Sequence, residues 1–361
     1  MNLLVTGGCG FIGTNLVRHA LLEGGHAVTN VDLLTYAGNR HSLSDLEGSA
    51  GYELVVADIC DADAMREVFA RVRPDAVLHL AAESHVDRSI DGPDAFVRTN
   101  VVGTSTLLQV ALEHWRSLEP VEAAAFRFIH VSTDEVYGSL GANDAPFTED
   151  TKYDPHSPYA ASKAASDHLA RAWHDTYGLP VIVTNCSNNY GPYQFPEKLI
   201  PVIVLKALAG EPIPVYGAGD NVRDWLYVED HVRALLRVLK EGAPGRTYNI
   251  GGNNEMRNID VVRRVCALLD EIAPAEDGRP YGTLITFVTD RPGHDKRYAI
   301  DATRITAELG WTPTADAEGA LGATVRWYVE HRDWWERILR GEYRLERIGL
   351  GTAGADSEEG S

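Results

Sequence analysis

Two short runs of the sequence carry side chains whose types and spacing could do acid–base chemistry together. The first is Thr133-Asp134-Glu135, and the second holds Tyr159 and Lys163, four residues apart. On a helix, residues four apart share one face, so the lysine ammonium would lie beside the tyrosine and favour its phenolate. A phenolate is a usable proton acceptor. Two neighbouring carboxyl groups can divide the roles of acid and base if their environments differ.

Each run alone also has an ordinary explanation. The chain has 15 tyrosines, so a chance Tyr-x-x-x-Lys is not rare, and a Thr-Asp-Glu run is more often a helix cap. The sequence around the two runs favours a catalytic role over these ordinary explanations. Residues 126–131 are typical of a short buried strand, and open α/β sheets bind ligands where such strands end. Pro158 and the alanines at 160, 161, 164 and 165 predict a helix that carries the second run.

The N-terminal residues predict a site for a dinucleotide. Residues 2–6 read as a buried strand, Gly7, Gly10 and Gly13 follow with the spacing G-x-x-G-x-x-G, and residues 14–23 read as a helix. Glycines let the backbone approach a pyrophosphate, which the helix N-terminus can hold. Asp32 ends a second strand over residues 27–32. A carboxylate there can bind ribose hydroxyls and would repel a 2′-phosphate, which favours NAD over NADP.

Strands and helices alternate through the first half of the chain, which predicts a Rossmann-type, doubly wound parallel sheet of the α/β class. We expect an NAD-binding domain over residues 1–185 and a smaller α/β substrate-binding region over 186–340, with some chain crossing back. Residues 349–361 are small and acidic, so we expect a disordered tail. The expected elements include strands at 54–58, 76–80, 180–184 and 247–250, helices at 61–72 and 93–114, and a surface loop at 117–125.

Composition excludes several classes of protein. The formal charge of −19 offers no basic field for a nucleic-acid backbone. The four cysteines are scattered, which suggests neither a zinc site nor a disulfide framework. The sequence opens directly on a strand-like segment, and no apolar run is long enough to span a membrane. We therefore expect a soluble cytoplasmic protein without a bound metal.

Several motifs resemble one superfamily closely. The run Thr6 to Gly13 together with Tyr159-x-x-x-Lys163 resembles the extended short-chain dehydrogenase/reductases. Within that superfamily, the chain is similar to the dTDP-glucose 4,6-dehydratases over roughly residues 1–340. The motifs that carry this likeness are residues 32–39, 81–89, 132–138, 188–201 and 221–225. Departures are Cys9, where the family usually has alanine, the longer 117–125 loop and the tail.

The resemblance implies a mechanism on dTDP-glucose. Tyr159 takes the proton from the sugar O4 while hydride leaves C4 for NAD, and Lys163 lowers the pKa of the tyrosine and binds the nicotinamide ribose. Thr133 hydrogen-bonds the O4 region. Glu135 removes the C5 proton, and Asp134 protonates the departing C6 hydroxyl. Return of the hydride to C6 gives dTDP-4-keto-6-deoxyglucose.

The same resemblance implies the binding residues and a homodimer formed through the 95–114 and 158–177 helices. The implied cofactor residues are Gly7, Gly10, Phe11, Ile12, Gly13, Asp32, Leu33, Thr35, Asp58, Ile59, Leu80, Ala81, Ala82, Thr99, Tyr159, Lys163 and Asn189. The implied substrate residues are Ser84, Thr133, Asn188, Lys198, Leu199, Pro214, Tyr216, Arg223, Asn258, Arg291 and His294.

Two alternatives compete with a dehydratase. An NAD-dependent nucleotide-sugar epimerase or decarboxylase needs the oxidation step but not both carboxyl groups after Thr133. A non-catalytic NAD-binding sensor would be expected to lose Tyr159, Lys163 or the acid–base pair. All of these residues are present, which favours the dehydratase.

Overall fold

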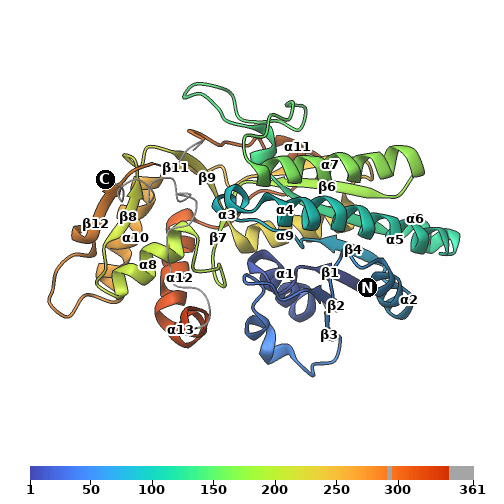
Figure 1. Cartoon of the computed structure of the whole chain (residues 1–361), viewed down its shortest axis with the longest axis horizontal. Helices are drawn as coiled ribbons and strands as arrows, with labels where there is room; N and C mark the ends of the chain where they lie inside the picture. The colour runs from blue at the N-terminus through green and yellow to red at the C-terminus, as the bar shows by residue number, and fades with distance from the viewer. Residues whose placement is uncertain (291–294, 341–361) are drawn as a thin grey trace, which may run out of the picture.

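A seven-stranded sheet, in which all strands run parallel, forms the larger part of the molecule (Figure 1). The structure is a computed structural model and describes residues 1–290 and 295–340. The strand order is β10-β6-β5-β4-β1-β2-β3. The strands are β1 (Asn2–Thr6), β2 (Ala27–Asp32), β3 (Tyr52–Val56), β4 (Ala76–His79), β5 (Arg127–Thr133), β6 (Val181–Cys186) and β10 (Thr247–Ile250).

Helices cover both faces of this sheet because its strands are apolar on both sides. On β1, Leu3 and Val5 point into one hydrophobic core, and Leu4 points into another on the opposite face. This arrangement confirms the predicted doubly wound parallel sheet. The first core is closed by α1 (Phe11–Leu22) and α9 (Val228–Glu241), and the second by α2 (Ala62–Val72), α5 (Thr104–Arg116) and α7 (Pro158–Tyr177).

The sheet opens a crevice where its connections change direction. β1 pairs with β2 on one side and with β4 on the other, so the connections after β1 and β4 lead to opposite faces. The loops that begin at Gly7 and Leu80 border this crevice, and the end of β5 lies beside it. The residues singled out for chemistry therefore gather at one edge of the sheet.

A smaller lobe from the second half of the chain faces this edge, at the left in Figure 1. It has its own hydrophobic core. The chain also returns to the large sheet, because α9 packs on it and β10 pairs with β6. The elements of the lobe are β7 (Asn188–Tyr190), β9 (Val222–Tyr227), β11 (Glu255–Arg257), β8 (Ile213–Tyr216), β12 (Ile285–Val288), α8 (Leu199–Leu208), α10 (Asn258–Ile272), α12 (Ala317–Glu330) and α13 (Arg332–Arg340).

Two local predictions were wrong. The expected single helix over 93–114 is interrupted by η2 (Val97–Gly103), a π-helical stretch between α4 (Pro93–Phe96) and α5. The expected loop over 117–125 contains α6 (Pro120–Ala125). Pro120 suits a first turn, and the Glu119 amide donates to the Glu122 carboxylate at 3.3 Å. The short elements elsewhere are η1 (Arg40–Leu46), α3 (Val86–Asp91), η3 (Asp134–Tyr137), η4 (Tyr281–Leu284) and α11 (Thr303–Leu309).

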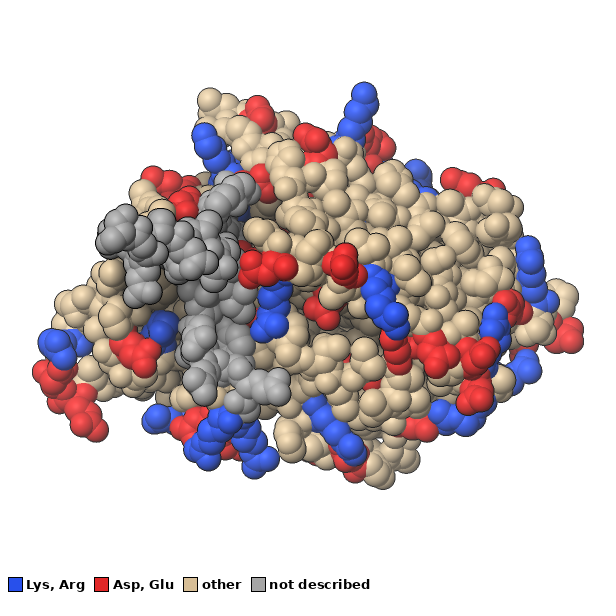
Figure 2. Space-filling view, in the orientation of Figure 1, with Lys and Arg blue, Asp and Glu red and all other residues tan. Residues whose placement is uncertain are grey.

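Charges of both signs are interspersed on the face of the molecule drawn in Figure 2, which shows no continuous basic surface there. Within residues 1–290 and 295–340, no helix is long and apolar enough to cross a membrane. The same residues hold no cluster of three His, Cys, Asp or Glu side chains suited to a metal ion. The tail predicted over 349–361 lies outside the described residues.

Candidate active site

Two adjoining pockets occupy the crevice, and together they hold every predicted cofactor residue. They share Gly10, Ala37, Leu80 and Ala82 in their walls, so they form one continuous cleft. One end is lined by the glycine loop and the ends of β2 and β3. The other end is lined by the residues at the end of β5, by α7 and by the segment after β6.

The glycine loop is packed too tightly for side chains. Gly7 has φ of 74°, and a Cβ there would lie 2.6 Å from the Ala81 amide nitrogen. A Cβ on Gly13 would lie 2.1 Å from the Gly7 carbonyl oxygen. α1 starts at Phe11, earlier than predicted, and no side chain caps it at Gly10, which lines both pockets. The helix therefore presents amide donors to the cleft, as a pyrophosphate requires.

Two backbone amides at the glycine-loop end of the cleft position the Asp32 carboxylate. Its Oδ2 accepts from the Cys9 amide and its Oδ1 from the Leu34 amide, both at 2.8 Å. Each carboxylate oxygen has a further lone pair for a ribose hydroxyl. Burial is the largest influence on Asp32 and raises its pKa, while the two amide donors oppose that shift. The glycine cradle and this carboxylate fit an NAD molecule.

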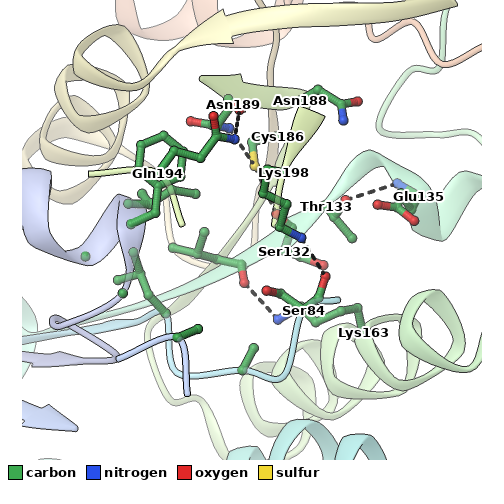
Figure 3. Close-up of a pocket in the computed structure, with 18 of the residues that line it drawn as sticks. Ser84, Ser132, Thr133, Glu135, Lys163, Cys186, Asn188, Asn189, Gln194 and Lys198 are labelled. Carbon is green, nitrogen blue, oxygen red and sulfur yellow. Dashed lines mark hydrogen bonds between the residues drawn. The ribbon is translucent and has the colours of Figure 1, made fainter. Parts of the chain in front are cut away.

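The end of β5 brings the three predicted catalytic side chains to the other end of the cleft. Thr133 is the last residue of β5, and Asp134 and Glu135 begin η3. The Glu135 amide donates to Thr133 Oγ1 at 3.3 Å, and Thr133 Oγ1 donates to Asp134 Oδ1 at 3.4 Å. The Thr133 hydroxyl acts to lower the pKa of Tyr159 and so favours its phenolate. Figure 3 shows Thr133 and Glu135 side by side on the wall of the pocket.

The two carboxyl groups lie in different environments. Asp134 is 1% exposed and Glu135 is half-buried. Burial, followed by the charges of Glu135 and Asp224, raises the pKa of Asp134 well above its ordinary value. Among the described residues, Asp134 Oδ2 has no hydrogen-bond partner. These influences favour the protonated form of Asp134, and its Oδ2 remains for another partner.

Tyr159 and Lys163 line the same pocket, from the first two turns of α7. Lys163 Nζ donates to the Val131 carbonyl at 2.9 Å, so the helix is tied to β5. The prediction that Lys163 lowers the pKa of Tyr159 was wrong for the protein without its ligands. Burial, and after it the Glu135 charge, raises the pKa of Tyr159 well above its ordinary value. Burial also lowers the pKa of Lys163.

Asn100 is a positioning residue that the sequence reasoning missed. It lies in the π-helical stretch η2 and is 1% exposed. Its side chain bonds both the amide and the carbonyl of Glu83 at 2.9 Å and donates to Ser162 Oγ at 2.8 Å. Ser162 in turn donates to the Tyr159 carbonyl. The available signal was an asparagine, a weak helix former, in the middle of a predicted helix.

Other missed residues line the cleft or support its wall. Glu197 is buried beside Lys198 and accepts from the Tyr36 hydroxyl at 3.2 Å. The resemblance motif over 188–201 contains Glu197 and Gln194, so a signal for both was present. The remaining unpredicted lining residues are Ala37, Gly38, Val31, Ala57, Glu83, Val131, Ser132, Cys186, Ser187, Gln194 and Phe195.

The predicted substrate residues fall into three groups. Ser84, Thr133, Asn188 and Lys198 line the cleft, and Lys198 Nζ donates to the Ser84 carbonyl across it at 3.4 Å (Figure 3). The second group lies on elements of the smaller lobe and does not line the described cavity: Leu199, Pro214, Tyr216, Arg223 and Asn258. Arg291 and His294 lie outside the described residues.

Arg223 and Asn258 lie in the smaller lobe, Arg223 near the start of β9 and Asn258 directly after β11. The Arg223 guanidinium stacks over the Tyr298 ring at 4.3 Å and donates to the Asp295 carbonyl at 3.0 Å. Asn258 begins α10, and its buried Oδ1 has no hydrogen-bond partner within the described part of the chain. Both side chains thus remain predictions as substrate ligands.

Comparison with known proteins identifies close relatives. A family model described as GDP-mannose 4,6 dehydratase matches residues 4–323. A dTDP-glucose 4,6-dehydratase of Neisseria meningitidis serogroup B is 57% identical over 351 residues, which are 97% of this chain and 99% of that protein. DesIV of Streptomyces venezuelae, a dTDP-glucose 4,6-dehydratase solved with NAD and a dTDP ligand, is 46% identical with a TM-score of 0.83. The match covers 94% of this chain and 100% of that one.

The fold is also shared with an epimerase. The UDP-glucose 4-epimerase of Thermus thermophilus, solved in complex with NAD, matches with a TM-score of 0.80 at 26% identity. That match covers 92% of this chain and 100% of the epimerase. Because dehydratases and epimerases share this architecture, only the side chains at the site can distinguish the two activities.

Proposed function

The chain belongs to the dTDP-glucose 4,6-dehydratase family, and on this premise we propose that it converts dTDP-D-glucose to dTDP-4-keto-6-deoxy-D-glucose and water. It is an NAD-dependent hydro-lyase. NAD, when bound in the cleft, supplies the hydride acceptor for C4 of the sugar and the hydride that returns to C6. The glycine loop holds its pyrophosphate, Asp32 its ribose, and Lys163 the ribose next to the nicotinamide.

The residues at the end of β5 divide the remaining work. Tyr159 accepts the O4 proton, and Thr133 positions O4 beside it. The resulting 4-keto group makes the C5 proton acidic. Glu135, which is half-buried, removes that proton, and neutral Asp134 protonates the departing C6 hydroxyl. Ser84, Asn188 and Lys198 line the same pocket and hold the sugar and its diphosphate.

The observation that carries the proposal is the contrast between Asp134 and Glu135. An epimerase or decarboxylase needs the Thr133, Tyr159 and Lys163 set but has no use for a neutral acid beside a base. In this site the two carboxyl groups are adjacent, differ in burial and line one cavity. A non-catalytic NAD sensor would need none of these groups.

A direct test is to incubate the purified chain with dTDP-glucose and measure the mass of the product. The expected product is lighter than the substrate by one water. An isomer of unchanged mass would instead indicate an epimerase, and loss of carbon dioxide from a uronic acid substrate would indicate a decarboxylase. Asp134→Asn serves as the matched variant, because it should reduce water loss while the protein still binds NAD.

We further propose that the enzyme works as a homodimer in the cytoplasm. The exposed face of η2 supports a dimer, because Val97 and Val102 there are 52% and 49% exposed. Sedimentation of the wild type and of Val102→Glu tests this: the variant should sediment as a monomer. The four cysteines are all unpaired, which suits a reducing compartment.

A further inference from the structure

A buried histidine, His231, lies behind Asn189 in the wall of the cleft. Asn189 belongs to β7, which pairs in parallel with β9, and β9 leads directly into α9. His231 is in the first turn of α9, is 0% exposed and does not line the cleft. The pairing of the two strands brings its ring to Asn189, where Nδ1 lies 2.9 Å from Asn189 Oδ1.

The direction of the Asn189 amide is fixed by its neighbours. Its nitrogen Nδ2 faces the Ser187 backbone carbonyl at 2.9 Å, and a carbonyl oxygen can only accept a hydrogen bond. This contact identifies the nitrogen of the amide, so the amide oxygen is the atom that faces His231. Because that oxygen also only accepts, His231 Nδ1 carries a proton and donates it to Asn189 Oδ1.

His231 is a neutral ring with a single proton. Burial lowers its pKa to about 3, so the imidazole is uncharged in neutral solution and has one N–H group. That group is Nδ1, which leaves Nε2 as a bare acceptor. In the described part of the chain, Nε2 has no hydrogen-bond partner. A buried nitrogen without a partner costs free energy, so packing alone does not account for a histidine at this position.

The hydrogen-bonding capacity that Asn189 has left is that of an amide facing another amide. Its Oδ1 keeps one lone pair besides the one that His231 uses. The second proton of its Nδ2 meets only the weak acceptor Cys186 Sγ, at 3.5 Å. A donor and an acceptor side by side are complementary to a primary amide. NAD contains one such group, the carboxamide of the nicotinamide ring.

Asn189 lies at the end of the cleft where the nicotinamide ring must react. Cys186 is the last residue of β6, and it pairs in register with the last residue of β5. Asn189 contacts Cys186, and both line the pocket that also holds Tyr159 and Lys163 (Figure 3). The amide is therefore close to the side chains that the oxidation step uses.

We propose that His231 is a positioning residue for the cofactor, because it fixes the Asn189 amide in the orientation that pairs with the nicotinamide carboxamide. Without the Nδ1 proton, Asn189 Oδ1 loses its partner and the amide is held through Nδ2 alone. The inference rests on the part of the proposed function that places the nicotinamide beside Tyr159. It adds a residue outside the cavity that determines how the cofactor ring is held.

Replacement of His231 by leucine and by asparagine separates this role from a general structural one. His231→Leu removes the donor, whereas His231→Asn keeps a nitrogen donor bonded to Cγ, as Nδ1 is. The measurement is calorimetric titration, after removal of copurified dinucleotide, with NAD and with ADP-ribose, which lacks the nicotinamide. His231→Leu should weaken NAD binding by on the order of 10-fold, as loss of one hydrogen bond implies, and leave ADP-ribose binding unchanged. His231→Asn should bind both ligands like the wild type.

Two further measurements use the wild type itself. Proton–nitrogen correlation NMR of protein labelled at histidine distinguishes a protonated ring nitrogen from a bare one. His231, assigned by the loss of its signals in His231→Asn, should show a proton on Nδ1 and none on Nε2. The acetylpyridine analogue of NAD replaces the carboxamide by a methyl ketone, which cannot donate to Asn189 Oδ1. The wild type should therefore bind this analogue more weakly than NAD.

Several outcomes would overturn the role of His231. His231→Leu would weaken NAD and ADP-ribose to the same extent if His231 only supports the fold, and would change neither if the histidine is irrelevant to the cofactor. The inference is also wrong if the wild type binds NAD no more tightly than ADP-ribose or the acetylpyridine analogue, or if Nε2 carries the proton. The proposed function fails separately, if the NAD-bound wild type releases no water from dTDP-glucose. The binding and NMR measurements still decide the role of His231 in that case.

Discussion

Asp167 lies one helical turn beyond Lys163 on α7, and both side chains are buried, at 0% and 4% exposure. The Asp167 carboxylate raises the pKa of Lys163 and so opposes the effect of burial on the ammonium. Its own oxygens accept from the Tyr153 hydroxyl at 2.8 Å and from Asn185 Nδ2 at 3.2 Å, and His130 Nε2 lies 3.1 Å away. A buried carboxylate thus favours the cationic form of a buried lysine one turn away.

Asp167→Asn should destabilise the protein by about 3–5 kcal/mol at neutral pH, the usual result of removing one partner of a buried pair. Burial acts to raise the pKa of Asp167, but the His130 hydrogen bond and the charges of His130 and Lys163 together outweigh it, so the pKa is lowered in the folded protein. The contribution of Asp167 to the free energy of unfolding is therefore present above the pKa that Asp167 has in the unfolded chain, and it is lost as the pH falls through its pKa in the folded protein. Urea unfolding of wild type and variant should converge in acid. A constant difference from neutral to acidic pH would contradict the charge argument.

Asp134→Asn should slow dehydration by on the order of 10²–10⁴, the usual contribution of a positioned acid. Because the pKa of Asp134 is raised, wild-type activity should persist above the ordinary range of aspartate and fall only when this buried acid finally ionises. A substrate with fluoride at C6 needs little protonation of its leaving group and should relieve the defect of the variant. If fluoride elimination is impaired to the same extent, Asp134 has another role.

Asp32→Ala should weaken the binding of NAD and reduce the difference in affinity between NAD and NADP, because a 2′-phosphate would no longer meet a carboxylate. Asp32 accepts from two backbone amides, so the backbone at Cys9 and at Leu34 also loses support. Titration of both dinucleotides by calorimetry measures the change. Asp45→Ala is a suitable control, since Asp45 pairs with Arg18 on the surface outside the cleft. Equal wild-type affinity for the two dinucleotides would refute the role of Asp32.

The strands and the cofactor loop could be predicted from the sequence because their signals are local. β1 and β2 have the predicted bounds, since each is a short segment rich in aliphatic or β-branched residues that ends before a glycine or at an acidic residue. The helix at 120–125 was missed because its start depends on Glu119 and Glu122, which were read as loop residues. The π-helical stretch at Asn100 was missed because its partners, Glu83 and Ser162, are far away in the chain.

The identity of the site residues could be predicted, but their environments could not. Asp134 and Glu135 are adjacent in sequence, yet only Asp134 is fully buried, and one of the charges that raises its pKa is Asp224 on β9. The raised pKa of Tyr159 likewise comes from burial and Glu135 and not from the neighbour four residues away. Such effects depend on the lobe that closes over the sheet, so spacing alone does not predict them.

Glu135→Gln should separate oxidation from elimination. The amide cannot take a proton from C5, so exchange of the C5 proton with deuterated solvent should be lost, and water loss with it. Removal of the O4 proton is assigned to Tyr159 and Thr133, and the variant keeps the Glu135 amide, which donates to Thr133 Oγ1 at 3.3 Å. Oxidation should therefore continue. Oxidation at C4 should even become easier, since the Glu135 charge raises the pKa of Tyr159 and its removal lowers the cost of forming the phenolate.

NMR of recovered substrate measures C5 exchange, and a deuterium isotope effect from C4 of the sugar measures oxidation. Normal C5 exchange in Glu135→Gln would assign the base to another residue, and Glu135→Asp, which keeps a shorter carboxylate, should retain part of the exchange if the assignment is right.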